Sequence, residues 1–137
     1  MRKIETIIVH CSDSPEGRAD TINDVKRWHV DERGFIDIGY HYVVHLDGSI
    51  HPGRRLNSTG AHCTGHNLTS IGICYIGGKT KNLKQTKDTR TDAQKIALKS
   101  LIRCLKAEFP EAKVHGHRDF ANKDCPCFDA KEEYKGL

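Results

Sequence analysis

The stretch Glu5-Thr6-Ile7-Ile8-Val9-His10 decides the fold, because it is short, continuous, apolar and rich in β-branched residues. Such a run predicts a buried strand. Its carboxyl end delivers His10 and Cys11 to a loop, and strands commonly pass into functional loops at that end. A lone histidine at a strand end is more often an ordinary surface residue. His10 therefore needs partners before it indicates a site.

A helix is predicted over residues 21–33, with Thr21 as its N-cap and Gly34 placed to end it. Three- and four-residue steps put one set of side chains on a common face. This set comprises Ile22, Val25, Trp28 and His29. Trp28 and His29 are expected in the core or at its edge rather than in catalysis.

A β-hairpin is predicted around Asp47-Gly48, which favours a two-residue turn between a strand at 38–46 and a return at 49–51. A third strand is expected at residues 70–76. The polar residues 79–90 are expected to form a solvated surface connection.

The clearest helix begins at a capping box, Thr91-x-x-Gln94, and stops at Phe109-Pro110. A last short strand is expected at residues 112–115. Because strands and helices alternate and a hairpin also occurs, the predicted fold class is α/β, a central mixed β-sheet flanked by α-helices in one domain, residues 1–137. The expected buried stripe of the helix is Ala93, Ile96, Ala97, Leu101, Cys104 and Leu105.

Composition limits the possible functions. The chain has 137 residues, 22 of them basic and 18 acidic, for a net charge of +4. No basic cluster occurs, so nucleic acid is not an expected partner. No apolar run is long enough to span a membrane, and the first residues lack the apolar segment of a signal peptide. We therefore expect synthesis in the cytoplasm, where cysteines stay reduced. Cys74 and Cys104 are expected to be buried as small apolar residues. We also expect the chain to be a monomer.

The loop at 115–129 concentrates metal-binding and charged side chains. His117 and Cys125 are donors that zinc prefers, but their separation does not match a structural zinc knuckle. A third ligand must come from elsewhere, and His10 is the best candidate. Three protein ligands leave one tetrahedral position free, as in hydrolytic zinc sites.

Amide hydrolysis at such a site needs a cation near the developing oxyanion and a group that handles the proton. Lys123, two residues from Cys125, could supply the cation. The Tyr40 hydroxyl could hydrogen-bond the tetrahedral intermediate, although a tyrosine at a strand entrance is as often only half-buried with its hydroxyl in water. Asp119 could share in proton transfer.

Five ordered segments resemble the zinc N-acetylmuramoyl-L-alanine amidases, a family that includes small phage lysozymes and peptidoglycan recognition proteins. The resemblance covers roughly residues 4 to 130. The segments are Ile-Val-His-Cys-Ser (8–12), Gly-Tyr-His-Tyr-Val-Val (39–44), Asp-Gly-Ser-Ile-His-Pro-Gly-Arg (47–54), Gly-Ala-His-Cys-x-Gly-His-Asn-x-x-Ser-Ile-Gly-Ile-Cys (60–74) and His-Arg-Asp-x-x-x-Lys-x-Cys-Pro (117–126).

The resemblance implies roles for particular residues. It puts the Zn²⁺ ligands on His10, His117 and Cys125 and the catalytic pair on Tyr40 and Lys123. It puts His62 and Asn67 near the substrate, with Asn67 bracing its loop. The implied reaction is hydrolysis of the amide between N-acetylmuramic acid and L-alanine in bacterial peptidoglycan, in cell-wall degradation or phage-type lysis.

Other interpretations remain open. Some relatives bind peptidoglycan without cutting it, but these typically lack the cysteine ligand, so Cys125 argues for the enzyme. A thiol hydrolase using Cys125 or Cys11 is a second rival. Cys127 departs from the family pattern; a partly buried thiol is the favoured interpretation over a metal ligand.

Overall fold

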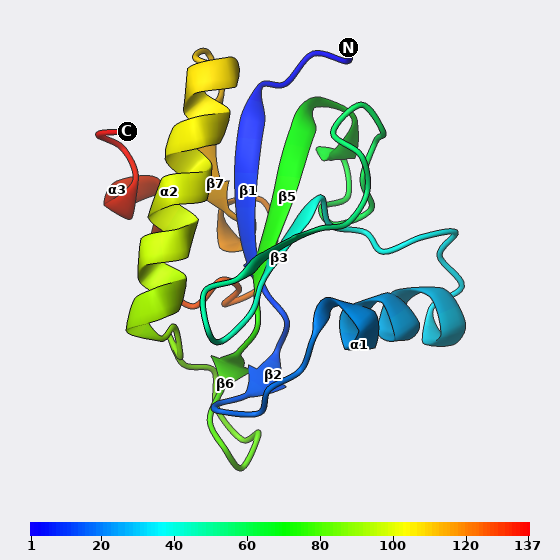
Figure 1. Cartoon of the computed structure of the whole chain (residues 1–137), viewed down its shortest axis with the longest axis vertical. Coiled ribbons are helices and arrows are strands. Elements are labelled where there is room, and N and C mark those ends of the chain that lie inside the picture. Colours follow the sequence, from blue (N-terminus) through cyan, green and yellow to red (C-terminus); the bar gives the residue numbers. More distant parts are fainter.

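The predicted apolar run is the second strand from one edge of a five-stranded mixed sheet, ordered β4-β3-β5-β1-β7 (Figure 1). A computed structural model describes all 137 residues. Neighbouring strands are parallel except β3 and β4. The α/β prediction is confirmed. The strands are β1 (Thr6–Cys11), β3 (Tyr42–Val44), β4 (Ile50–Pro52), β5 (Ser70–Tyr75) and β7 (Lys113–Gly116).

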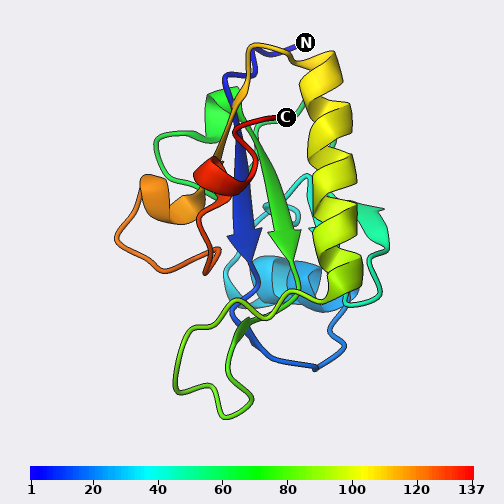
Figure 2. The same cartoon turned by 90° about the vertical axis from the view of Figure 1, so that its left-hand side faces the viewer.

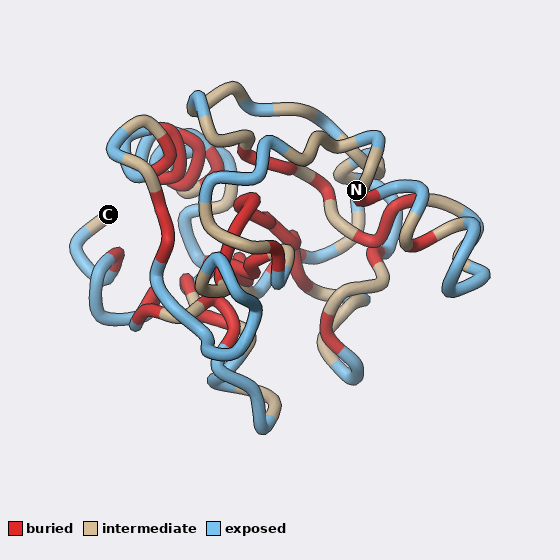
Figure 3. The backbone as a smooth tube through the Cα atoms, turned by 90° about the horizontal axis from the view of Figure 1, so that it is seen from below, coloured by how far each residue is buried: buried red, intermediate tan, exposed pale blue.

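Strand β1 lies in the interior, with Ile7, Ile8 and Val9 fully buried. Helix α2 (Asp92–Glu108) runs alongside β1 and β5 and covers one face of the sheet (Figures 1 and 2). Buried side chains of β1, β5 and α2 form one apolar cluster, and the short helix α3 (Ala130–Glu133) adds Ala130 to it. Each fully buried isoleucine or valine contributes roughly 1.5–3 kcal/mol. The buried backbone accordingly gathers at the centre of the molecule (Figure 3).

The alternation of side chains along β1 positions the functional site. Ile7 and Val9 belong to the cluster under α2. His10, one residue on, therefore faces the opposite side of the sheet. That side carries helix α1 (Ile22–Arg27) and a smaller cluster of Val25, Ile38, Val43, Cys74 and Ile76.

The helix predicted over residues 21–33 changes type part-way. Helix α1 ends at Arg27, and Trp28–Glu32 (η1) continue as a π-helix. Wide π-turns are frequent at functional sites. The backbone N–H of Phe35 closes the segment by donating to the carbonyl of His29. His29 is thereby buried, as expected for the core edge, but its ring also lines a cleft.

The predicted hairpin is present, but its turn is not the expected two-residue loop. Strands β3 and β4 are joined by residues 45–49, and the N–H of Gly48 donates to the carbonyl of His45. Gly48 has φ +84°, so it takes the left-handed position after the turn instead of a central one.

Thr91 caps helix α2 with the predicted capping box, but the buried face of the helix differs from the expected stripe. Ile96 is 69% exposed and Cys104 is exposed, whereas Leu98 and Ile102 are buried. The buried face includes Gln94, whose side-chain amide donates to the carbonyls of Val44 in β3 and of Ile76, the residue after β5. These contacts fix Gln94 on the side of the helix that faces the sheet. Cys74 is buried as predicted.

Residues 79–90 are mostly exposed, but the segment ends in a buried anchor. The Arg90 guanidinium pairs with Asp88 and Glu133 and lies 3.3 Å from the centre of the Phe128 ring. At the start of the segment, β6 (Gly78–Lys79) pairs with β2 (Ser14–Pro15). No helix combines the length and apolarity needed to cross a bilayer.

Candidate metal centre and active-site cleft

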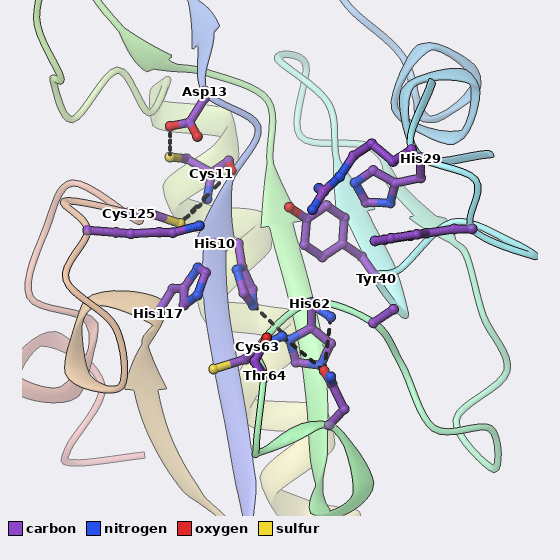
Figure 4. Close-up of a pocket in the computed structure, with 15 residues that line it drawn as sticks. His10, Cys11, Asp13, His29, Tyr40, His62, Cys63, Thr64, His117 and Cys125 are labelled. Atoms are coloured by element: carbon purple, nitrogen blue, oxygen red, sulfur yellow. Dashed lines mark hydrogen bonds between the residues drawn. The ribbon is translucent and has the colours of Figure 1, made fainter. Parts of the chain in front are cut away.

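Three potential metal ligands from distant parts of the chain meet beyond the carboxyl ends of β1 and β7. The donor atoms of His10, His117 and Cys125 all lie within 4.8 Å of one another. His10 belongs to β1, His117 begins the 3-10 helix η3 (His117–Asp119) directly after β7, and Cys125 lies in the next loop. Figure 4 shows the two imidazoles side by side below the Cys125 sulfur.

Strand pairing sets the spacing of the two histidines. In the parallel β1–β7 ladder Val9 is opposite Gly116, so His10, still in β1, and His117, the first residue after β7, each follow this pair. Neighbouring strands lie about 4.8 Å apart. The two ring centres are 4.6 Å apart, close to this spacing.

The three donors fit a zinc ion by chemistry and by distance. Two imidazole nitrogens and one thiolate sulfur are the ligand types of zinc hydrolases. Zinc bonds of about 2.0–2.3 Å at tetrahedral angles separate donors by roughly 3.3–3.7 Å. The observed upper limit of 4.8 Å needs only a small inward adjustment of the side chains.

Both histidines are held in the neutral form that a metal requires. Burial is the main cause that lowers the pKa of His10 well below its ordinary value, and the neighbouring His62 and His117 add to it. Burial also lowers the pKa of His117, helped by the positive charge of Lys123. At neutral pH no proton therefore competes for these nitrogens.

The third donor is buried and oriented by the backbone. The N–H of Cys11 donates to the Cys125 sulfur across 3.2 Å. Cys127 lies outside the donor group: its sulfur is 3.9 Å from that of Cys11 and 3.4 Å from the carbonyl oxygen of Gly78. It is a partly buried thiol that packs behind the ligand loop.

Tyr40 lies across the cleft from the donors. Its ring centre is 5.1 Å from that of His10 and 5.2 Å from that of His29, and its hydroxyl points back toward β1 (Figure 4). Burial raises the pKa of Tyr40 well above its usual value. The hydroxyl therefore stays protonated at neutral pH and can donate a hydrogen bond.

Lys123 and the donors line a single cleft of about 260 Å³. Arg33 adds a second cation and Asp13 a carboxylate, so the wall carries both charges. The lining residues are His10, Cys11, Asp13, His29, Arg33, Phe35, Tyr40, Ala61, His62, Cys63, Thr64, Asn67, His117, Lys123 and Cys125.

His62 and Asn67 also line the cleft, and both make internal contacts there. The Nδ1 atom of His62 is 2.8 Å from Nε2 of His10. The side-chain oxygen of Asn67 accepts from the backbone N–H groups of His62 and Cys63, which braces their loop. Asp119 does not line the cleft, because its carboxylate caps η3 by accepting from the N–H of Gly116.

Several lining residues escaped the sequence analysis, notably His29, Arg33 and Phe35. The π-turn brings them to the cleft, and an ordinary helical pattern does not indicate such a turn. The sequence feature that could have indicated this turn is Gly34. In the structure Gly34 has φ +74° and redirects the chain between Arg33 and Phe35.

Comparison with known proteins gives a consistent result. The family model described as N-acetylmuramoyl-L-alanine amidase matches residues 1–128. The endolysin of Klebsiella phage KP32 is 37% identical over 126 residues, which span 91% of this chain and 82% of that protein.

Two solved structures share the fold across nearly the whole chain. The amidase LysC of Clostridium intestinale has a TM-score of 0.80 at 27% identity. The match spans 98% of this chain and 84% of LysC. PGRP-SA of Apis mellifera has a TM-score of 0.81 at 25% identity, with 100% of this chain and 84% of that one covered.

Proposed function

The chain belongs to the N-acetylmuramoyl-L-alanine amidase family, and from this premise we propose that it is a zinc hydrolase of bacterial peptidoglycan. Its substrate bond is the amide between N-acetylmuramic acid and the L-alanine of the stem peptide. The observation that carries the zinc assignment is the convergence of His10, His117 and Cys125 in one cleft.

Zinc held by these three residues would polarise the scissile carbonyl and lower the pKa of water enough to supply a nucleophile at neutral pH. The chain contributes the rest. Burial keeps His10 and His117 neutral, and the Cys11 N–H orients the sulfur of Cys125.

Lys123 and Tyr40 are proposed to act on the substrate. As water adds to the carbonyl carbon, negative charge develops on the carbonyl oxygen. The ammonium of Lys123 offsets this charge, and the protonated Tyr40 hydroxyl donates a hydrogen bond to it. A preorganised donor of this kind contributes roughly 3–4 kcal/mol to the transition state. Breaking the C–N bond releases a carboxylic acid on the muramic acid and the amine of L-alanine.

We propose cell-wall degradation of the phage-lysis type as the biological role, with the enzyme reaching the wall after release from the cell that made it. The endolysin relative supports this role. The alternative to an enzyme is a module that binds peptidoglycan without cutting it, and the likeness to PGRP-SA leaves this alternative open. The cysteine ligand and the cationic Lys123 beside it favour hydrolysis over simple binding.

Digestion of purified peptidoglycan followed by mass spectrometry tests the proposal. We expect separated glycan chains and stem peptides with a free L-alanine amine, loss of this activity with a chelator and recovery with zinc. Wall material that is bound but uncut would indicate the binding-only module. Cleavage that persists without metal would indicate a thiol hydrolase.

A further inference from the structure

His62 makes a direct contact with a candidate metal ligand, and the proposed chemistry does not yet use it. Its Nδ1 atom lies 2.8 Å from Nε2 of His10, and the rings meet edge to face with centres 4.8 Å apart. A contact this short is a hydrogen bond in which one nitrogen carries the shared proton.

From this contact we infer that His62 is a positioning residue that presents Nδ1 of His10 to the metal. The inference rests on the proposed zinc function. Because Nε2 of His10 is engaged with His62, Nδ1 is the ring nitrogen left for an ion. A ligand imidazole that binds through Nδ1 carries its proton on Nε2, so Nδ1 of His62 must act as the acceptor.

A further contact matches this assignment of protons. If His62 accepts at Nδ1, its own proton is on Nε2. That nitrogen lies 3.3 Å from the hydroxyl oxygen of Ser70, the fully buried first residue of β5. A chain of hydrogen bonds therefore runs from His10 in the donor group through His62 to Ser70 in the sheet.

Two glycines leave the space that the imidazole ring of His62 occupies. A Cβ atom at Gly72 would lie 2.6 Å from the ring, and one at Gly60 would lie 2.8 Å from it, so both positions leave space that the ring fills. Asn67 holds the backbone of His62 from the other side. The ring is thus fixed by packing as well as by hydrogen bonds, as a supporting residue of a metal ligand must be.

Two near-isosteric variants separate positioning from simple space-filling. Asparagine at position 62 places its amide oxygen near the position of Nδ1 and can still accept from His10. Glutamine reaches toward the position of Nε2 and leaves His10 without this acceptor. His62→Leu is a second variant without an acceptor. His66→Asn, on the same loop but outside the cleft lining, is the matched control.

The measurements are zinc affinity of the purified full chain, by competition with a chromogenic chelator, and the visible spectrum of the cobalt-loaded chain. Folding is checked by thermal melting. We expect His62→Gln and His62→Leu to bind zinc about 10–100-fold more weakly with an altered cobalt spectrum. His62→Asn should recover most of the affinity, and His66→Asn should match the unmodified chain.

Equal zinc affinities in the unmodified, glutamine and leucine chains would overturn the positioning role while leaving the proposed function intact. So would equal weakening in the asparagine and glutamine variants, because space-filling alone would then explain the loss. An unmodified chain that binds no zinc would instead overturn the proposed function, and the inference with it.

Discussion

The backbone N–H of Cys11 donates a hydrogen bond to the sulfur of Cys125, although the two residues are 114 positions apart. The bond joins the end of β1 to the loop that follows β7. It holds the thiol beside the two imidazoles. The end of β1 therefore supplies one donor, His10, and positions another, Cys125.

The first prediction concerns the two thiols of the Cys125-Pro126-Cys127 segment. Cys125→Ser should lose zinc binding and hydrolysis together, because a hydroxyl is a much poorer zinc ligand than a thiolate. Cys127→Ser is the control and should keep both, since its sulfur lies outside the donor group. Metal content by mass spectrometry and wall-digestion rates check this. Loss of zinc from the Cys127 variant alone would reverse the assignment.

The second prediction concerns Lys123, an exposed side chain at the cleft. Lys123→Ala should keep zinc and thermal stability, while kcat falls about 10²–10³-fold, because the charge acts on the transition state. Steady-state kinetics on solubilised peptidoglycan, alongside zinc titration, provide the measurement. A variant with full turnover would remove the lysine from the mechanism.

The third prediction concerns the Tyr40 hydroxyl. Tyr40→Phe preserves the ring contacts with His10 and His29, so folding and zinc affinity should stay unchanged. We expect kcat to fall about 10²-fold with little change in KM. Because the pKa of Tyr40 is raised by burial, the unmodified enzyme should show no loss of rate from its ionisation near pH 10. A rise in KM alone would assign the hydroxyl to ground-state binding.

The fourth prediction concerns acid stability of the metal-free protein. Burial lowers the pKa values of His29 and His41 to about 4. Between pH 6.5 and 4 the unfolded chain therefore binds more protons than the folded one, so the free energy of unfolding falls as the pH drops through this window. Each histidine contributes at most about 1.4 kcal/mol per pH unit.

Urea unfolding with chelator present, at pH 7 and pH 5, measures this effect. A midpoint that does not move between the two pH values would show that these histidines are not buried in the neutral form. Keeping the chelator in both samples excludes the separate loss of metal that protonated ligands would cause.

Sequence patterns were sufficient for two elements whose signal was local and continuous, although the local Asp47-Gly48 signal predicted the wrong turn. The run at β1 and the capping box at Thr91 predicted their elements, because burial and capping act over a few residues. The three metal-ligand candidates came from their chemical types and, more specifically, from the family resemblance. The structure brings all three together.

Features that depend on partners far along the chain escaped prediction. Ile96 and Cys104 were expected inside but are exposed, and the buried face of α2 instead includes Gln94, which bonds to the carbonyls of Val44 and Ile76. The contact of His62 with His10 spans 52 positions and follows from the packing of a loop against the sheet. Neither contact is indicated by the spacing of apolar residues or by a helix-capping motif.

The pairing of β1 with β7 makes metal uptake a sensitive reporter of correct folding. A two-residue slip of β7 would keep Val114 on the same face of the sheet, so the alternation of side chains between the two faces would not oppose it. The same slip would carry His117 about 6.6 Å along the sheet and out of reach of His10. Zinc uptake by a refolded preparation would therefore report the native β1–β7 register, which measurements of helix and strand content do not test.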